Sequence, residues 1–352
     1  MAESYRIGRL FGISVELHWT FILLMLVSLL LSAYLFVLLA LLFICVLIHE
    51  VAHSVASLRN NVKVRKIILL PIGGASIIDD AKLSPEVEFN VAVSGPLMSL
   101  FLGCLFGVLV VFAPPGMITQ VLQFLFLMNI FLGLFNLMPA FPTDGGRVFR
   151  SYLERKRGEY DATMITVKAS KCVLVLFVLG SLAYYVLIGA SLFDMEFLLL
   201  FDLLIAFYLY GGAMSEKQMA ELKRDSRGLS VIGAVSRHFA LVSPDTSVHD
   251  LYGVVSRSGE HVLLTKIGDD YAYVNLLGAL KSAKPRTARD LARKLPSMPA
   301  GTGIVDALRR MGGEESGIGV VLSKGRLAGI VTLSSLQTFL SLHVLNKKSL
   351  SP

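Results

Sequence analysis

Residues 46–56 read VLIHEVAHSVA and place two histidines, His49 and His53, four residues apart, with Glu50 between them. On an α-helix, side chains four residues apart lie on one face, about 6 Å apart along the axis. Two imidazoles at this spacing can bind one metal ion, and the glutamate is then close enough to take a proton from a water that the metal activates. The stretch therefore predicts a helix that gives a zinc site two ligands and a base.

The apolar sequence before this motif bears on its meaning. Residues 35–48 contain no charged residue, so the helix that carries the histidines can lie in lipid. An ionisable group at the centre of a membrane helix costs roughly 2.5–3.5 kcal/mol, and such groups are by default functional. The alternative is that the helix has left the bilayer at Ile48 and that the polar residues simply face water.

The composition is that of a membrane protein with a soluble part. Of 352 residues, 54% are hydrophobic and 17% charged, against about 25% charged in soluble domains. Long apolar runs end near residue 212. We therefore predict a transmembrane domain over residues 1–212, a linker over 213–228, a second domain over 229–345 and a tail over 346–352. We interpret the net charge of +7 as membrane topology, with no nucleic-acid partner.

Hydrophobic runs predict a membrane α-helical bundle with six transmembrane helices. The expected spans are residues 19–33, 34–58, 90–112, 117–138, 172–189 and 193–210. Lys and Arg gather before the first span, between the second and third, and between the fourth and fifth. By the positive-inside rule both termini are cytoplasmic, and the ends of the second and fourth spans emerge on the same side.

Residues 67–78 read IILLPIGGASII and interrupt the helical pattern. Pro71 and the pair Gly73–Gly74 disfavour a helix, so the flanking apolar runs predict strands, as a small β hairpin or sheet. A strand edge near a protease site can receive an extended peptide by strand addition. An ordinary structural hairpin is the alternative.

The fourth span ends in NLMPAFPTDGG, residues 136–146, where two prolines break the helix and Asp144 follows. Irregular backbone at membrane depth must be surrounded by protein or line a cavity. On the same span, Asn129 and Asn136 are seven residues apart and share one face, which predicts that this face points into protein. Asp202 is a second acid within a span, and we favour a paired structural role for it.

Several separated motifs together resemble the site-2 protease family of intramembrane zinc metalloproteases. They are VLIHEVAHS, PIGGAS, SGPLMS, and NLMPAFPTDGG preceded by MNIF, and the resemblance covers roughly the first 210 residues. It implies that His49, His53 and Asp144 are the zinc ligands and that Glu50 is the general base. It also implies that Asn136 assists the oxyanion or positions the substrate.

The expected activity is hydrolysis of peptide bonds within or near the transmembrane helix of a membrane protein. The substrate would be a single-span protein whose helix unwinds locally, with Gly73, Gly74 and Asn129 as candidate contacts. We expect a multi-pass protein in contact with lipid, in a prokaryotic plasma membrane. Two alternatives stay open: a metal transporter, and a catalytically inactive pseudoprotease that binds membrane helices.

Residues 229–343 contain two half-similar units and resemble a tandem pair of cystathionine-β-synthase-type (CBS) domains, an α/β regulatory module. The resemblance implies an adenine nucleotide between the halves. The usual closing signature ends in Asp, whereas the second unit has Gly329, Thr332 and then Ser335, and the first has Asn275 and Gly278. Because neither unit has the ribose-binding carboxylate, nucleotide binding and a structural role in a homodimer both stay open.

Overall fold

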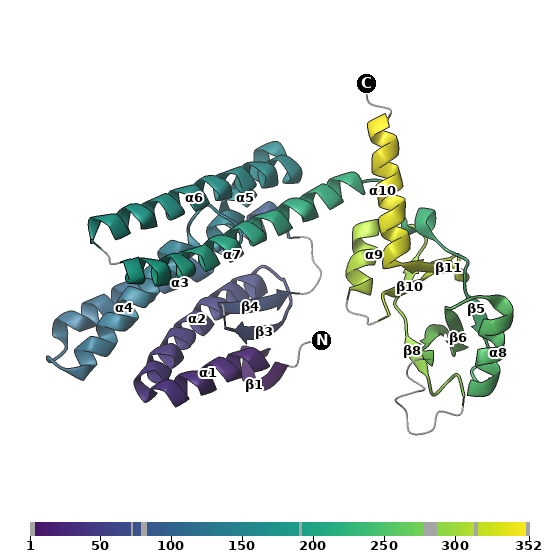
Figure 1. The fold of residues 1–352 in the computed structure, drawn as a ribbon, viewed down its shortest axis with the longest axis horizontal. Helices are drawn as coiled ribbons and strands as arrows, with labels where there is room; N and C mark the ends of the chain where they lie inside the picture. Colours follow the sequence, from purple (N-terminus) through teal and green to yellow (C-terminus); the bar gives the residue numbers. More distant parts are fainter. Residues whose placement is uncertain are drawn as a thin grey trace. The chain divides into compact units, whose positions relative to one another are not determined.

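The computed structural model describes residues 4–71, 73–78, 83–189, 192–276, 287–312 and 316–349 (Figure 1). The chain divides into two compact units, Met1–Ala220 and Glu221–Pro352. The division falls inside the predicted linker over residues 213–228, while the other predicted domain boundaries stay predictions.

The first unit is a bundle of mostly apolar helices, in which the helix over residues 144–157 is polar. They are α1 (Trp19–Leu31), α2 (Ala33–Arg59), α3 (Pro85–Phe112), α4 (Met117–Asn136), α5 (Asp144–Arg157), α6 (Glu159–Leu187) and α7 (Leu192–Asp225). Within the described residues, α2, α3, α4 and α6 are long and apolar enough to cross a membrane. The α1 helix has 13 residues, fewer than the ~20 of a typical span. The helical membrane bundle is confirmed, and the number of six spans stays a prediction.

Ser32 separates α1 from α2 and begins the helix that carries the histidines. Its backbone is extended, and its hydroxyl accepts a hydrogen bond from the backbone N–H of Tyr34. Such a cap satisfies one of the unpaired N–H groups at a helix start. The α2 helix then runs unbroken through His49 and His53 to Arg59, as the sequence predicts.

A four-stranded sheet packs against α2 (Figure 1). Its strands are β1 (Ser4–Leu10), β2 (Ile13–His18), β3 (Val64–Leu70) and β4 (Gly73–Ile78), in that spatial order. The β2 and β3 strands are parallel and the other pairs antiparallel. Alternate apolar residues of the two inner strands are buried: Ile13, Val15, Ile67 and Leu69. The predicted hairpin is confirmed as β3–β4, and β4 is an edge strand.

The predicted break after the fourth span lies between α4 and α5, and its second half packs against protein. Phe141 is fully buried, and its backbone N–H donates to the Ser170 hydroxyl of α6. The hydroxyl of Thr143 donates to the carbonyl oxygens of Met138 and Ala140. These contacts fix the turn in place, so Asp144 begins α5 at a defined position.

Asp202 is paired, as the sequence predicts. The Tyr185 hydroxyl of α6 donates to its carboxylate at 2.7 Å, and both residues are buried. The α7 helix that carries Asp202 continues to Asp225. The first part of the predicted linker is therefore a continuation of this helix.

The second unit repeats one arrangement twice. In each half a strand and a helix precede a parallel strand and its antiparallel partner, which accounts for the two half-similar sequence units. The first half has β5 (Ala240–Val242), α8 (Val248–Ser258), β6 (Leu263–Ile267), β7 (Asp270–Val274) and β8 (Ala292–Lys294). The second has β9 (Ser297–Pro299), α9 (Ile304–Met311), β10 (Ile318–Ser323), β11 (Arg326–Thr332) and α10 (Leu333–Ser349).

A shared core joins the two halves. Leu264 of β6 packs in one buried cluster with Ile318 and Val320 of β10 and Ile330 of β11. The α10 helix includes much of the predicted tail. Gly278, part of the predicted signature of the first half, lies outside the described residues.

Candidate metal centre

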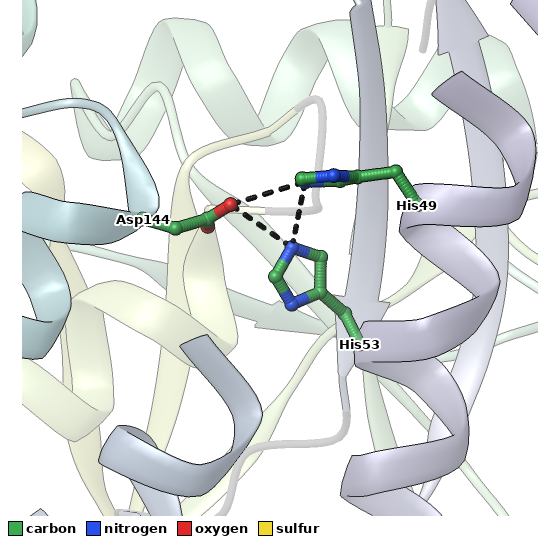
Figure 2. A group of neighbouring side chains, drawn as sticks. All are labelled: His49, His53 and Asp144. Carbon is green, nitrogen blue, oxygen red and sulfur yellow. Dashed lines mark hydrogen bonds and ion pairs between the residues drawn. The ribbon is translucent and has the colours of Figure 1, made fainter. Parts of the chain in front are cut away.

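Two histidines of one helix and an aspartate of another converge on one point (Figure 2). The Nε2 atoms of His49 and His53 are 3.1 Å apart, and the Asp144 Oδ2 atom lies 3.1 Å from the first and 3.0 Å from the second. Both imidazoles are buried. Within the described part of the chain, this is the cluster of His, Cys, Asp and Glu that could hold a metal ion.

The other nitrogen of each imidazole has its own partner. The Nδ1 atom of His53 donates to the backbone carbonyl of Val91 at 2.7 Å, and the Nδ1 atom of His49 is 2.9 Å from the Ser99 hydroxyl. Both partners belong to α3. A proton held at Nδ1 leaves the lone pair of Nε2 free to bind a metal, and the contact also fixes the orientation of the ring.

Gly95 lets α3 approach the histidines closely. A Cβ atom at this position would lie 2.3 Å from the His53 Nε2 atom and 2.6 Å from the His49 Nε2 atom. Any side chain here would occupy the space between the donor atoms. Gly95 and Ser99 are four residues apart and so share one face of α3. This face leaves space for the two Nε2 atoms at Gly95 and gives His49 a hydrogen-bond partner at Ser99.

The donor set fits zinc. Nitrogen and oxygen ligands at ~2.0–2.2 Å from a tetrahedral ion lie about 3.3 Å from one another, close to the separations in the cluster. Three protein ligands of this kind are typical of catalytic zinc sites, in which the fourth position is open to water or substrate. Residues that are 95 positions apart in the chain meet here, as the predicted topology allows.

Glu50 lies beside the cluster and contacts the edge strand. Its carboxylate accepts a hydrogen bond from the Ser76 hydroxyl of β4 at 2.9 Å. A Cβ atom on Gly74 would be 2.3 Å from the Glu50 Cγ atom, so only glycine permits this approach. The neighbouring Gly73 has a φ of +138° and open space around it. The strand that the sequence predicts as a peptide receiver therefore packs directly on the predicted base.

A partly buried ion network holds the helix that begins with Asp144. Arg150 of α5 pairs with Glu88 of α3 and, at 3.3 Å, with Glu216 of α7. Burial alone would lower the pKa of the guanidinium, but the two carboxylates outweigh it and raise that pKa. Arg150 also lies over the ring of Phe141 in the turn before Asp144. The network thus links the turn, the aspartate and the helix that carries Gly95.

The two asparagines take different positions. Asn129 is fully buried, and its amide donates to the Cys45 Sγ atom of α2 and to the Leu125 carbonyl. Asn136 is half-buried at the end of α4 and donates to the Leu132 carbonyl. The face that they share does point into protein at Asn129, as predicted.

Sequence reasoning missed four residues around the centre: Ser76, Gly95, Ser99 and Arg150. The motif SGPLMS contains Gly95 and Ser99 at helical spacing, which is a signal for a common face. Ser76 closes the motif PIGGAS, but no spacing connects it with Glu50. Arg150 lies in a basic segment that the sequence analysis used only to predict membrane orientation. Its ion pairs with residues of α3 and α7 set it apart from the other basic residues of the segment.

Comparison with known proteins places this geometry in a family. The model of peptidase family M50 matches residues 37–119 and 113–179. A zinc metalloprotease of Methanocaldococcus jannaschii is 29% identical over 365 residues, which cover 99% of this chain and 99% of that protein. A solved site-2 protease from the same organism is 32% identical to this chain, the match covers 61% of this chain and 95% of the other, and the TM-score is 0.44. The chain belongs to the site-2 protease family.

This M50 peptidase is therefore a zinc metalloprotease of the membrane. The solved CBS domain of a bacterial CNNM/CorC family Mg²⁺ transporter in complex with ATP matches 36% of this chain and 97% of its own length, with 14% identity and a TM-score of 0.30.

Proposed function

We propose that this protein is an intramembrane endopeptidase that hydrolyses peptide bonds within or near the transmembrane helix of membrane-protein substrates. The observation that carries the proposal is the convergence of His49, His53 and Asp144 inside a bundle of apolar helices, beside the Glu50 carboxylate. Ionisable residues among membrane helices are costly and are by default functional. Hydrolysis of a peptide bond is a function that uses such residues.

His49, His53 and Asp144 would hold the zinc ion. Bound there, zinc supplies a Lewis acid that polarises a carbonyl and brings the pKa of water near neutrality. The Val91 carbonyl and the Ser99 hydroxyl keep the two imidazoles in the orientation that binding requires. Asp144 is the first residue of α5, where the helix N-terminus favours its negative charge.

Glu50 would act as the general base and then as the acid. It follows His49 directly in α2. Its carboxylate bonds to Ser76 and is not one of the three groups that could hold the metal. A free carboxylate in this position can take a proton from the attacking water and return it to the leaving amine. Asn136 is the candidate for steadying the substrate carbonyl.

The edge of β4 would hold the substrate in an extended form. Gly73 and Gly74 keep this edge open, and its other edge is already paired with β3. A single-span substrate that unwinds locally can add a strand there through backbone hydrogen bonds. Because Asn129 is fully buried and bonds α4 to α2, we assign substrate contacts to the strand in preference to Asn129.

Six spans would result if α1 and α7 cross the membrane together with α2, α3, α4 and α6. The positions of Lys and Arg then place both termini in the cytoplasm, and we propose the plasma membrane of a prokaryote as the location. In this topology the ends of α2 and α4 lie on the same side of the membrane. The two histidines and Asp144 can then meet, as binding of one metal ion requires.

The second unit contains a cavity of about 660 Å³ that could hold a regulatory ligand. Its lining includes Thr332 and Ser335 of the predicted signature, together with Arg237 and His238. None of the described residues that line it is acidic. Adenine nucleotide remains one candidate, and a ligand-free structural role in a homodimer the other. Titration calorimetry with adenosine phosphates, beside a measurement of mass in detergent, separates the two.

One comparison tests the function. Purified wild type and Glu50→Gln are incubated in detergent with a single-span substrate, with and without a zinc chelator. We expect cleavage by wild type alone, abolished by the chelator and restored by added zinc. Equal behaviour of the two proteins would contradict the protease and favour a pseudoprotease or a metal transporter.

A further inference from the structure

We infer that Ser76 is a positioning residue for the reaction: its hydroxyl holds the Glu50 carboxylate in place and couples the base to the strand that receives substrate. This inference rests on the proposed function. Its first support is the hydrogen bond itself, in which the Ser76 hydroxyl donates to the Glu50 Oε2 atom at 2.9 Å.

The geometry of β4 directs this contact. Side chains of a strand alternate between its two faces, so Gly74 and Ser76 share one face. Gly74 lies against the Glu50 Cγ atom and Ser76 against the carboxylate. The base is therefore held along its length by two positions of one strand face. Ala75 and Ile77 point to the other face, where Ile77 is exposed.

A second serine completes the arrangement. Ser54 is one helical turn after Glu50 on α2 and is fully buried, and its hydroxyl lies 3.3 Å from that of Ser76. Ser76 thus has one partner to which it donates and a second hydroxyl beside it, both on one face of α2. This pairing limits rotation of the Ser76 side chain and keeps its proton directed at Glu50.

The consequence concerns alignment. Substrate that adds to the free edge of β4 is placed relative to the backbone of this strand, and the base is placed relative to the same strand by Ser76. One short element then sets the position of both reacting partners, and a small misplacement of either lowers the rate. Because the Ser76 side chain faces α2, it does not take part in the edge pairing itself.

The test compares Ser76→Ala, Ser76→Thr and a control, Ser181→Ala, which removes a serine hydroxyl from α6 whose partner is the Val178 carbonyl of its own helix. Cleavage of the single-span substrate is followed as kcat and KM separately. A hydrogen bond to a charged group contributes roughly a 10- to 100-fold effect, so we expect S76A to lower kcat by that factor with KM unchanged. We expect S76T to recover most of the rate and S181A to equal wild type.

Zinc content per chain, measured by atomic absorption, is the second readout and should be equal in all variants, because Ser76 contacts none of the three ligands. Wild-type kcat in S76A, a change in KM alone, or a loss of zinc would each overturn the inference. So would an S76T variant as slow as S76A, because packing and not the hydroxyl would then matter. Failure of wild type to cleave would instead contradict the proposed function.

Discussion

Asp144 and Asp202 are both carboxylates among the helices of the first unit, and their surroundings differ. Among the described residues Asp202 pairs with the Tyr185 hydroxyl of the adjoining helix, and the pair is buried. Asp144 meets two imidazoles, each with a partner of its own on α3. A buried acid alone therefore does not mark a site. Convergence of several ligand atoms, each oriented by a further contact, does.

The largest expected effect separates these two acids directly. Asp144→Asn removes a proposed ligand and should lower activity by roughly 10⁴-fold, because zinc contributes several kcal/mol of transition-state stabilisation. Asp202→Asn keeps a group that can bond Tyr185 and should retain activity within a few-fold. Rates and bound zinc are measured for both. Similar losses in the two variants would remove the distinction drawn above.

The second test concerns how Asp144 is held. Arg150→Met leaves Glu88 and Glu216 without their partner, and because these side chains are 13–32% exposed the loss is smaller than the about 3–5 kcal/mol of a fully buried pair. We expect a lower thermal midpoint in detergent and weaker zinc binding. Arg147→Met, at an exposed position of the same helix, is the control. Unchanged stability in R150M would show that the turn alone positions Asp144.

The third test addresses the close approach of α3. Gly95→Ala places a methyl group between the two Nε2 atoms, and we expect zinc affinity to fall by about 100-fold, in the range of overpacking and of lost support around metal ligands. Gly180→Ala, where a Cβ atom meets nothing within 4 Å, should match wild type. Affinity is measured by competition with a chelating dye. Equal affinity in G95A would mean that the helices can separate freely.

The smallest effect belongs to an ion pair between the strands β2 and β3. Glu16 accepts hydrogen bonds from Lys66, at 2.7 Å, and from Ser4, and these contacts lower its pKa. The stability that they add is present above the unfolded pKa of ~4.3 and is lost as pH falls through the lower folded value. For a pair near the surface this is at most about 1 kcal/mol.

Glu16→Gln should remove that part of the pH dependence while activity at neutral pH is unchanged. Thermal midpoints of both proteins between pH 3 and 7 provide the measurement. A difference between the curves that persists unchanged to the lowest pH would contradict the assignment to Glu16.

Local sequence patterns were sufficient to predict several elements of the first unit. The spacing of His49 and His53, the Gly73–Gly74 pair beside Pro71, and the two prolines after Asn136 each specify a local structure through backbone sterics or helical periodicity. The helix, the hairpin and the break all occur where these signals predict them. The positive-inside rule added one long-range statement, that Asp144 can reach the histidines.

The sequence by itself determined which residue types could bind a metal, because chemistry and helical period are local properties, and it predicted that these residues emerge on one side of the membrane. Only the tertiary structure decided that Ser76 bonds Glu50, that Gly95 lets α3 reach the imidazoles and that Arg150 links three helices. These contacts join residues distant in the chain, and their existence depends on how whole elements pack, which no short pattern encodes.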